Sequence, residues 1–455
     1  MAHLIDSKIF GSSWATPELK ALFDDKALVR DWLKIMSVLA ETQAEYQLIP
    51  NHAATGIKQG IDNLVLDEAF FGEVEQGFRD TNHSLLGLIQ AVNKACPDDS
   101  GEWLCYGATV QDITDTRMVL ILKHFHNCIS HHLANIDDVL IRHCLEHRDT
   151  LMCGRTHGQH GLPITFGYKV AGWLDEFHRH SQRLAEILPR LSYGQLAGGV
   201  GSLSSLGVHA IEIQRSFCTR LGLSVPSVSW TSSRDRIVEW VNLLALIAST
   251  CDRIANEVYN LQRPEIDELR EGFVEGNVGS ITMPQKRNPE LSEHIGTLAR
   301  IVRNSATQMN EIMVQDHERD GKAWKTEWIV FPEACLAAEK AINLSFQLLS
   351  HLSVNVDRMR SNIFSYNDFI FAEAVMLAMA PTLGKQSAHI QVYDLIVKAK
   401  KDNIKFKQAL LADNTVSKLL GHKKIETIFE VDKLTSYCGV MVDQVLNKVK
   451  YEKNV

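Results

Sequence analysis

Side chains able to handle an anion gather in one stretch of the chain, residues 272–289. It contains the hydroxyl of Ser280, the thioether of Met283, the ammonium of Lys286 and the amide of Asn288. Glycines precede these residues, so the backbone can bend freely there, and prolines near its end keep it out of a regular helix. A hydroxyl, a cation and an amide together suit an anionic reactant. The spacing predicts a catalytic loop over residues 272–289 that closes over a ligand.

Two histidines stand close together in a second stretch, residues 154–163. This stretch is rich in glycine and precedes another expected helix, which predicts a loop that carries His157 and His160. The imidazole ring gains and loses a proton near neutral pH, so either histidine is a candidate general acid or base. A lone histidine is usually structural or solvated, but a loop position before a helix favours function.

A third stretch, residues 107–116, stands directly before the first long expected helix. The first turn of a helix exposes unpaired N–H groups and a partial positive charge, both of which attract a carboxylate. Thr109 and Gln111 would add side-chain donors to such a site. The alternative is a plain helix cap made by Thr109 or Asp112.

Charged residues form two further stretches, residues 233–236 and 316–328. The first contains Arg234 and the second contains Arg319. Taken alone, each stretch is typical of a solvated or ion-paired helix end. His83 is a weaker candidate, because a single histidine carries little information.

The elements that must position these residues are long helices. No glycine or proline occurs from Ala108 to Cys153 or from Glu333 to Ala380. In the first of these runs, and again between Pro226 and Pro264, apolar residues recur every three or four positions, which is the spacing of one helix face. The two stripes consist of Leu122, Phe125, Ile129, Leu133, Ile136 and Leu140, and of Leu244, Ile247, Cys251, Ile254, Val258 and Leu261.

Strand signals are few, so the sequence predicts an all-α protein. We expect three parts: an N-terminal helical domain over residues 1–105, a long central helix bundle over 106–360 and a C-terminal helical domain over 361–455. Within the first part, helices are expected to break near Gly60 and Gly77. The second stripe resembles a heptad seam too long for one chain to cover, which predicts an oligomer.

Composition excludes several classes of protein. The net charge of −8 and the lack of a basic run argue against a nucleic-acid surface. The nine cysteines are scattered without CxxC spacing, which is typical of reduced thiols in a cytoplasmic protein. No secretory signal, no apolar stretch of membrane-spanning length and no metal-ligand cluster is visible. We therefore expect a cytoplasmic protein without a metal site or a membrane contact.

The first stretch resembles the signature loop of the fumarase/aspartase superfamily, Gly-Ser-Ser-x-Met-Pro-x-Lys-x-Asn-Pro, with Ile281 in place of the second serine. Residues 107–116 resemble the first signature block of that superfamily. The run from Thr156 to Gln159 resembles the adenylosuccinate lyase block, in which the histidine is the general acid. His160 instead matches the histidine of the carboxymuconate cycloisomerases, so which histidine acts stays open.

Other stretches resemble both of these branches. Residues 233–236 and 317–320 are shared by the two, and His83 loosely matches a substrate-binding histidine of the adenylosuccinate lyases. After Asp320 the chain follows the cycloisomerases, with Trp324, Glu327 and Trp328. Adenylosuccinate lyases place serines and an arginine there to hold the nucleotide phosphate. A glutamate would repel a phosphate, so the expected substrate is not a nucleotide.

The resemblance implies a homotetramer with a 20-helix core, in which each active site combines blocks from three subunits. It implies an adenylosuccinate lyase-like C–N lyase: an anti β-elimination that releases fumarate from a small succinyl-type dicarboxylate and needs no cofactor. Ser280 would be the base, Lys286 and Asn288 would hold the carboxylate where charge develops, and His157 or His160 would be the acid. The implied substrate-binding residues are Thr109, Gln111, Thr156, Gln159, Asn288, Met283, Arg234, Arg319 and His83.

Two alternatives stay open. The same chemistry can run as ring closure, in which a carboxymuconate is converted to a lactone. The chain could also be a non-catalytic structural protein of the same fold, as some lens crystallins are. The joint presence of Ser280, Lys286, Asn288 and His157 speaks against the second alternative.

Overall fold

The computed structural model describes residues 3–272, 276 and 279–453. The chain forms two compact units, and each is assembled from three separate segments. The first unit comprises Met1–His131, Gln182–Ser249 and Thr297–Ile342, and the second comprises His132–Ser181, Thr250–Gly296 and Asn343–Val455. The predicted division into three consecutive parts is a different partition of the chain, and it stays a prediction.

Helices make up most of the described chain, which confirms the predicted all-α class. Two short antiparallel pairs of strands are the β-structure within that described part. The helices of the first half are α1 Gly11–Trp14, α2 Pro17–Lys20, α3 Asp25–Glu45, α4 Asn51–Asp62, α5 Glu68–Thr81, α6 Leu86–Ala95, α7 Val110–Glu146, α8 Phe166–Leu191 and α9 Ala210–Arg220. The others are α10 Asp235–Leu261, α11 Glu290–Glu311, α12 Gly321–Ser350, α13 Val356–Ile363, α14 Ala372–Leu383, α15 Lys385–Lys401, α16 Phe406–Ala412, α17 Asn414–Leu420, α18 His422–Ile428, α19 Val431–Leu434 and α20 Ser436–Lys453. The strands are β1 Leu151–Thr156, β2 Gln159–Thr165, β3 Leu269–Arg270 and β4 Ser353–Val354.

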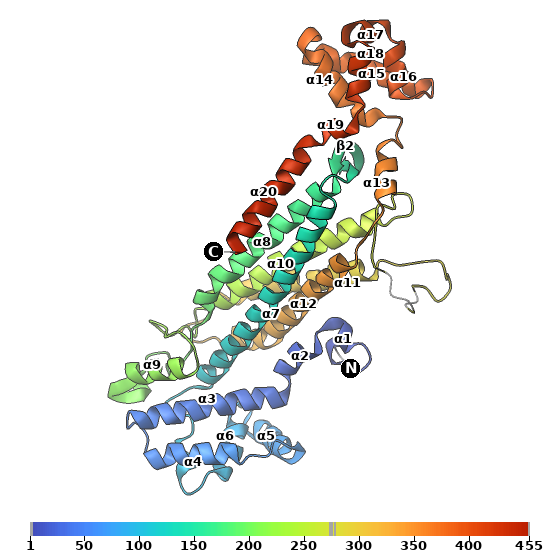
Figure 1. Cartoon of the computed structure of the whole chain (residues 1–455). Helices are drawn as coiled ribbons and strands as arrows, with labels where there is room; N and C mark the ends of the chain where they lie inside the picture. Colours follow the sequence, from blue (N-terminus) through green and yellow to red (C-terminus); the bar gives the residue numbers. More distant parts are fainter. Residues whose placement is uncertain (1–2, 273–275, 277–278, 454–455) are drawn as a thin grey trace. The chain divides into compact units, whose positions relative to one another are not determined.

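The longest helix, α7, has 37 residues and follows the predicted apolar stripe. All six residues of that stripe, from Leu122 to Leu140, have no exposed surface. Within each unit, the parts of α7, α8, α10, α11 and α12 that belong to it run along one another (Figure 1). Among the described residues, none of the helices has both the length and the apolar character needed to cross a membrane.

The stripe on α10 is buried inside the single chain. Its residues from Leu244 to Leu261 are each at most 2% exposed. The expectation that one chain could not cover this seam is therefore wrong, because the neighbouring helices of the same chain already bury it. The seam gives no argument for an oligomer.

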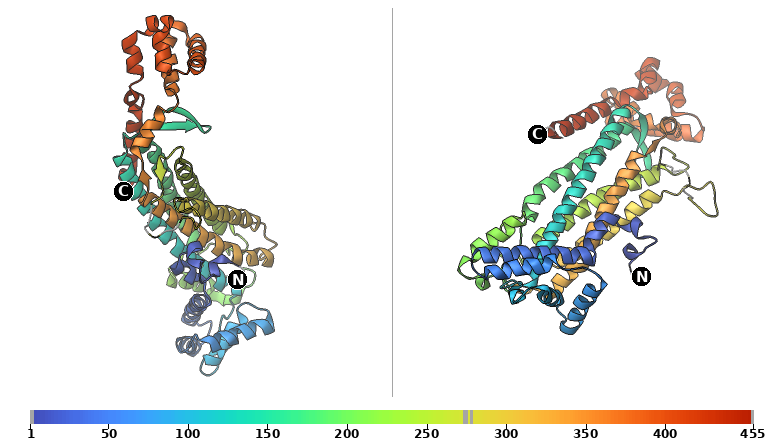
Figure 2. Two further views of the ribbon diagram at one scale, coloured as in Figure 1. Left: turned by 90° about the vertical axis from the view of Figure 1, so that its right-hand side faces the viewer. Right: turned by 60° about the horizontal axis from the view of Figure 1, so that its bottom comes forward.

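Two glycines expected to end helices lie inside them instead. Gly60 is part of α4 and Gly77 is part of α5. A Cβ atom on Gly60 would come within 2.8 Å of the Cys96 sulfur, and one on Gly77 within 2.6 Å of the Gly87 Cα. These glycines allow close packing between helices, which outweighs their low helix propensity. The result is a compact group in which α4 packs on α3 and α6 on α5 (Figure 2).

In the second unit, helices α14 to α18 enclose a small hydrophobic core of their own (Figure 1). Val375, Met379, Phe406 and Leu410 are fully buried in it. The nine cysteines of the chain are free thiols, as their scattered positions predicted.

Candidate active site

The signature loop folds back on itself around Ser280. The Ser280 hydroxyl oxygen accepts a hydrogen bond from the Met283 backbone N–H at 3.0 Å, and the Lys286 N–H donates to the Met283 carbonyl at 2.9 Å. A Cβ atom on Gly279 would lie 2.5 Å from the Lys286 carbonyl oxygen, so only glycine fits this close approach. The fold of the loop thus supplies a backbone donor to the oxygen that is the expected base.

The ends of the loop are fixed, whereas its tip is exposed. Asn288 donates to the Gly279 carbonyl oxygen at 2.8 Å. The Glu271 carboxylate accepts from the N–H groups of Leu291 and Ser292 at 3.0 and 2.8 Å and so caps α11. Ile281 is 97% exposed, and the Lys286 side chain is exposed as well. Of the predicted loop, residues 273–275 and 277–278 lie outside the described residues.

The two histidines lie on a β-hairpin rather than in an open loop. β1 and β2 pair antiparallel, and the cross-strand pair Thr156 and Gln159 brackets the turn. His157 and Gly158 form that turn with φ angles of 52° and 74°. Such left-handed pairs match the twist of the two strands, which explains why a glycine-rich stretch forms a hairpin here. His157 is therefore exposed at the tip, while His160 belongs to β2.

His160 is partly buried and lies near the ion pair of Arg155 and Glu268. Burial, followed by the nearby Arg155 charge, lowers the pKa of His160. Its Nδ1 atom has no hydrogen-bond partner among the described residues. Arg155 itself is fixed by a bidentate ion pair with the fully buried Glu268, at 2.6 and 2.8 Å, and Asn362 donates to the same carboxylate at 2.8 Å. Both effects favour the uncharged form of the His160 ring.

At the start of α7, Asp112 organises the third stretch. Its buried carboxylate accepts from the N–H groups of Thr109, Ala197 and Gly198 at 2.9, 2.9 and 3.0 Å. Burial raises the pKa of Asp112 to about 6 in spite of these donors. Asp112 thus caps the start of α7, as the alternative interpretation of this stretch predicted. The Thr109 hydroxyl is left to accept a hydrogen bond from Arg319 at 2.6 Å, so two predicted binding residues lie together.

Gln111 is turned into the protein. The side chain is 1% exposed, and its amide nitrogen donates to the Thr231 carbonyl oxygen at 3.2 Å. Its amide oxygen has no hydrogen-bond partner in the described part of the chain. A buried amide with these contacts supports the helix start, and a role of Gln111 in substrate binding stays a prediction.

Arg234 is occupied by two carboxylates. Its guanidinium forms bidentate pairs with Asp115, at 2.8 and 3.1 Å, and with Glu327, at 2.8 and 2.5 Å. All three side chains are almost fully buried. Burial raises the pKa of both Asp115 and Glu327, and the Arg234 charge opposes that shift. The geometry gives Arg234 a structural role. Glu327, which the sequence analysis expected to repel a phosphate, is paired with Arg234 and almost fully buried.

His83 is exposed at the start of α6. Its Nδ1 atom accepts from the N–H groups of Leu85 and Leu86 at 3.3 and 3.2 Å. This is a helix cap supplied by a histidine, so the residue has a structural function whether or not it also meets a ligand.

A large cavity in the first unit was missed by the sequence reasoning. Its volume is about 1280 Å³, and aromatic side chains from α3, α5 and α12 line it: Trp32, Phe71, Phe78, Trp324, Trp328 and Phe331. Thr114 and Asp115 of α7 also line it. The only signal in the sequence was the spacing of Trp324 and Trp328, which places them on one face of a helix. Their rings meet edge to face, 4.7 Å apart.

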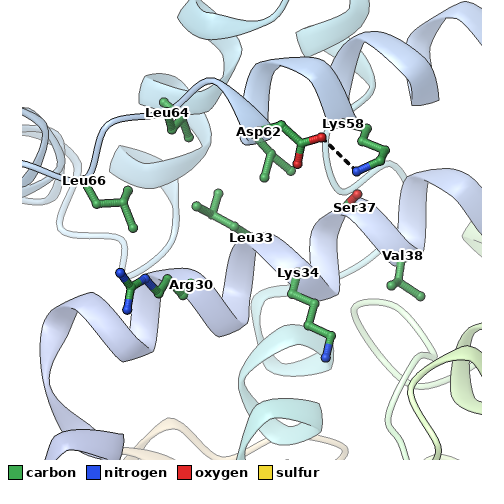
Figure 3. A pocket seen from close by; sticks show the side chains of 10 residues that line it. Arg30, Leu33, Lys34, Ser37, Val38, Lys58, Asp62, Leu64 and Leu66 are labelled. Atoms are coloured by element: carbon green, nitrogen blue, oxygen red, sulfur yellow. Dashed lines mark hydrogen bonds and ion pairs between the residues drawn. The ribbon is translucent and has the colours of Figure 1, made fainter.

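A smaller cavity of about 320 Å³ lies between α3 and α4 (Figure 3). Arg30, Lys34 and Lys58 give it a basic lining, and Lys58 pairs with Asp62 at 2.8 Å. None of the predicted site residues lines it.

Near the end of α7, the side chains of His143, Glu146 and His147 place possible metal-ligating atoms within 4.8 Å of one another. His143 contacts the Leu349 carbonyl oxygen at 2.9 Å and His147 contacts the Thr150 hydroxyl at 3.2 Å. One ring nitrogen of each histidine is thus already in a structural contact. Sequence spacing did not single out this group.

Comparison with known families decides the assignment. A family model described as "Lyase" matches residues 12–303. The chain belongs to this lyase family. A second model, "Adenylosuccinate lyase C-terminus", matches residues 368–445 of the enzyme. The resemblance to the fumarase/aspartase superfamily and to its adenylosuccinate lyase and cycloisomerase branch is therefore confirmed.

Relatives of the enzyme span its whole length. It is 36% identical to N-acetyl-S-(2-succino)cysteine lyase of Dickeya dadantii (strain 3937), over 98% of this chain and 97% of the relative. A fumarate lyase from Mesorhizobium sp. BNC1 has 34% identity and a TM-score of 0.88, covering 96% of this chain and 99% of the other. The 3-carboxy-cis,cis-muconate lactonizing enzyme from Pseudomonas putida has 27% identity and a TM-score of 0.89, with 98% and 99% covered.

Proposed function

We propose that this lyase catalyses an anti β-elimination on a small succinyl-type substrate and releases fumarate. The observation that carries the proposal is the loop around Ser280, whose hydroxyl oxygen accepts the Met283 N–H at 3.0 Å. A backbone donor at that distance stabilises the oxygen when it loses its proton. The relative from Dickeya dadantii, named for a succinylated cysteine, supports a substrate that is not a nucleotide.

In the proposed reaction, Ser280 removes a proton from the carbon next to a carboxylate. The charge that develops on this carboxylate needs donors that are already in place, because water is a slower and weaker stabiliser. Lys286 is exposed on the same loop, and Asn288 is fixed near its base. Thr109 and Arg319 would hold the second carboxylate of the substrate, since their side chains already meet at 2.6 Å.

We assign the general acid to His157. Burial and the Arg155 charge lower the pKa of His160 and so disfavour its protonated form, which makes it the weaker candidate for the acid. His157→Asn is therefore expected to lower kcat by roughly 10²-fold, and His160→Asn by much less. The measurement is turnover with leaving groups of graded basicity, where loss of the acid hurts most for the poorest leaving group. A larger loss in His160→Asn than in His157→Asn would reverse the assignment.

Cycloisomerisation of a carboxymuconate is the second candidate function. The solved structure from Pseudomonas putida supports it, as does the run of Trp324, Glu327 and Trp328. A panel assay tests both functions by following fumarate release from N-succinyl and S-succinyl compounds, nitrosuccinate and adenylosuccinate, and lactone formation from carboxymuconate. We expect fumarate from the non-nucleotide compounds. Cleavage of adenylosuccinate at about 10⁴ M⁻¹s⁻¹ or faster would contradict the proposed substrate class.

We further propose that the enzyme works as a cytoplasmic homotetramer with shared active sites. A site assembled from neighbouring subunits would combine Ser280, Lys286 and His157 with Thr109 and Arg319, as the family resemblance implies. Apolar side chains also stay exposed on the long helices, with Leu246 at 53% and Ile329 at 73%.

Light scattering is expected to show a tetramer at micromolar concentration. Ile329→Asp should weaken assembly and activity together, because a charge at an apolar contact costs affinity. Ile211→Asp, on the short helix α9 and 53% exposed, is the matched control and should leave both unchanged. A stable and fully active monomer would defeat the shared-site proposal.

A further inference from the structure

The side chains at the end of α7 form a group that the proposed reaction does not use. His143, Glu146 and His147 all belong to the second unit, and each places one possible ligand atom within 4.8 Å of the other two. Residues three and four positions apart lie on one face of a helix, so the backbone itself brings these side chains together. The contacts of each side chain indicate what the group can bind.

The ring of His143 is held in a tautomer that can bind a metal. Its Nε2 atom contacts the Leu349 carbonyl oxygen at 2.9 Å. A carbonyl oxygen only accepts hydrogen bonds, so Nε2 carries the hydrogen and the lone pair lies on Nδ1. This Nδ1 atom is buried and has no hydrogen-bond partner among the described residues. A buried acceptor without a donor is costly, and a bound metal ion would remove that cost.

His147 is arranged in a similar way. Its Nδ1 atom lies 3.2 Å from the Thr150 hydroxyl oxygen, which can accept a hydrogen bond and so leave the lone pair on Nε2. Nε2 lies 3.9 Å from a carboxylate oxygen of Glu146, beyond hydrogen-bond distance. Phe166 packs edge to face against the buried ring, with centroids 5.2 Å apart. Histidines that bind metals usually donate their other ring N–H to a protein oxygen in this manner, which fixes the ring.

The spacing of the three ligand atoms is close to that of a tetrahedral site. Zn²⁺ binds histidine nitrogen and carboxylate oxygen at about 2.0–2.2 Å, so neighbouring ligand atoms of a tetrahedron lie roughly 3.3–3.6 Å apart. Glu146 can move to meet this requirement, because its side chain is 71% exposed. The same exposure leaves room for water as the fourth ligand.

The charges around the group also favour a cation. It lies at the C-terminal end of α7, where carbonyl groups without helix partners carry a partial negative charge. Arg148 follows directly in the chain, but Asp149 and Asp443 occupy its guanidinium at 2.6–3.1 Å. Two carboxylates thus offset the one guanidinium, and Arg148 adds no unbalanced positive charge.

We propose that His143, Glu146 and His147 bind one Zn²⁺ ion with water as the fourth ligand, although the sequence predicted no metal site. Two imidazoles and one carboxylate form a ligand set that zinc accepts, whereas Mg²⁺ and Ca²⁺ prefer oxygen ligands. The ion holds the last turn of α7 and the residue that follows it in one arrangement. Since the folded helix end brings the ligands together, zinc stabilises the folded protein. This proposal does not depend on the proposed elimination.

Calorimetry with Zn²⁺ and the full-length enzyme tests the site. The enzyme is first dialysed against a chelator, so that its metal-binding groups start empty. We expect one Zn²⁺ ion to bind per chain, at least about tenfold more tightly than Mg²⁺. The absence of a zinc site of this stoichiometry, or equal binding of Mg²⁺, overturns the proposal.

Matched variants locate the ion, because other histidines and the free thiols of the chain could also bind zinc. Glu146→Gln keeps the shape of an exposed side chain and should weaken Zn²⁺ binding at least about tenfold, since even changes behind the ligands cost that much. His143→Gln should weaken it by at least the same factor. The controls are Asp138→Asn and His124→Gln, which change exposed residues of the same helix outside the group and should bind zinc like the wild type. Wild-type affinity in both ligand variants, or equal losses in the controls, overturns the proposal.

Co²⁺ reports the ligand geometry independently of affinity. A four-coordinate Co²⁺ ion absorbs visible light far more strongly than the six-coordinate hydrated ion, so the spectrum distinguishes a built site from scattered surface binding. Wild-type enzyme should show the strong bands with one equivalent of Co²⁺, and Glu146→Gln should lose or shift them. A weak six-coordinate spectrum in the wild type would contradict the proposed ligand set.

Discussion

Ser280→Ala is expected to lower kcat by about 10²–10⁴-fold while leaving substrate binding nearly unchanged. The hydroxyl is the expected base, and its oxygen is held by the Met283 N–H inside a loop whose ends are fixed. Removing one oxygen atom at a half-buried position disturbs little packing. Turnover is followed by fumarate absorbance and binding by calorimetry with fumarate itself.

Thr282→Ala is the matched control for this variant. Thr282 lies two residues away on the same loop, carries the same kind of hydroxyl and is exposed. It should retain nearly full activity. If Ser280→Ala kept more than about half of the wild-type rate, another group would have to be the base.

Arg234→Ala is expected to destabilise the protein by about 3–5 kcal/mol, the usual cost of breaking a buried ion pair by removing one partner. The change leaves Asp115 and Glu327 buried without their common counter-charge. Urea unfolding of wild type and variant gives the difference. Arg253→Ala is the control and should change little, because Arg253 is about half exposed and pairs with Glu176 at the surface.

The effect of Arg234→Ala should also depend on pH. Burial raises the pKa of both Asp115 and Glu327, and without Arg234 the opposing influence is gone. A carboxyl group with a raised folded-state pKa stabilises the fold below its unfolded pKa, and this contribution is lost as the pH rises through the folded value. The variant should therefore approach wild-type stability as the pH falls toward the unfolded-state pKa of the two carboxyl groups, about 4. A deficit independent of pH would mean that lost packing, rather than charge, causes the instability.

Much of the fold was predictable because helix periodicity is a local property. The stripe from Leu122 to Leu140 predicted the buried face of α7, and all six of its residues are buried. The same periodicity on α10 predicted a helix correctly. It wrongly predicted that a single chain could not cover the apolar face of that helix. A stripe shows that a face is covered, but it does not show whether the cover comes from the same chain.

Other features depend on contacts that no local pattern reveals. The sequence around Gly60 predicts the end of a helix. In the fold, Gly60 instead allows close packing against Cys96, which lies 36 positions later in the chain. The sequence around Arg234 indicates an anion-binding residue. Its two carboxylate partners come from α7 and α12, so the local sequence does not reveal them. For the candidate site, the motifs singled out the loop at Ser280, Thr109 and Arg319, and their roles stay predictions; the contact between Thr109 and Arg319 appears only in the structure. The large cavity required the fold, since its walls come from four helices.

Because the segments of the two units alternate along the chain, they constrain when the protein can fold during its synthesis. The first unit is incomplete until the segment ending at Ile342 has been made, and the second until the last segment has emerged. At about 5–20 residues per second, the growing chain spends roughly 20–70 s with no complete unit to fold into. During that time the apolar faces of α7 and α10 lack the helices that will bury them. The nascent chain should therefore be a strong client of ribosome-associated chaperones, and truncations before Ile342 should aggregate instead of yielding a folded fragment.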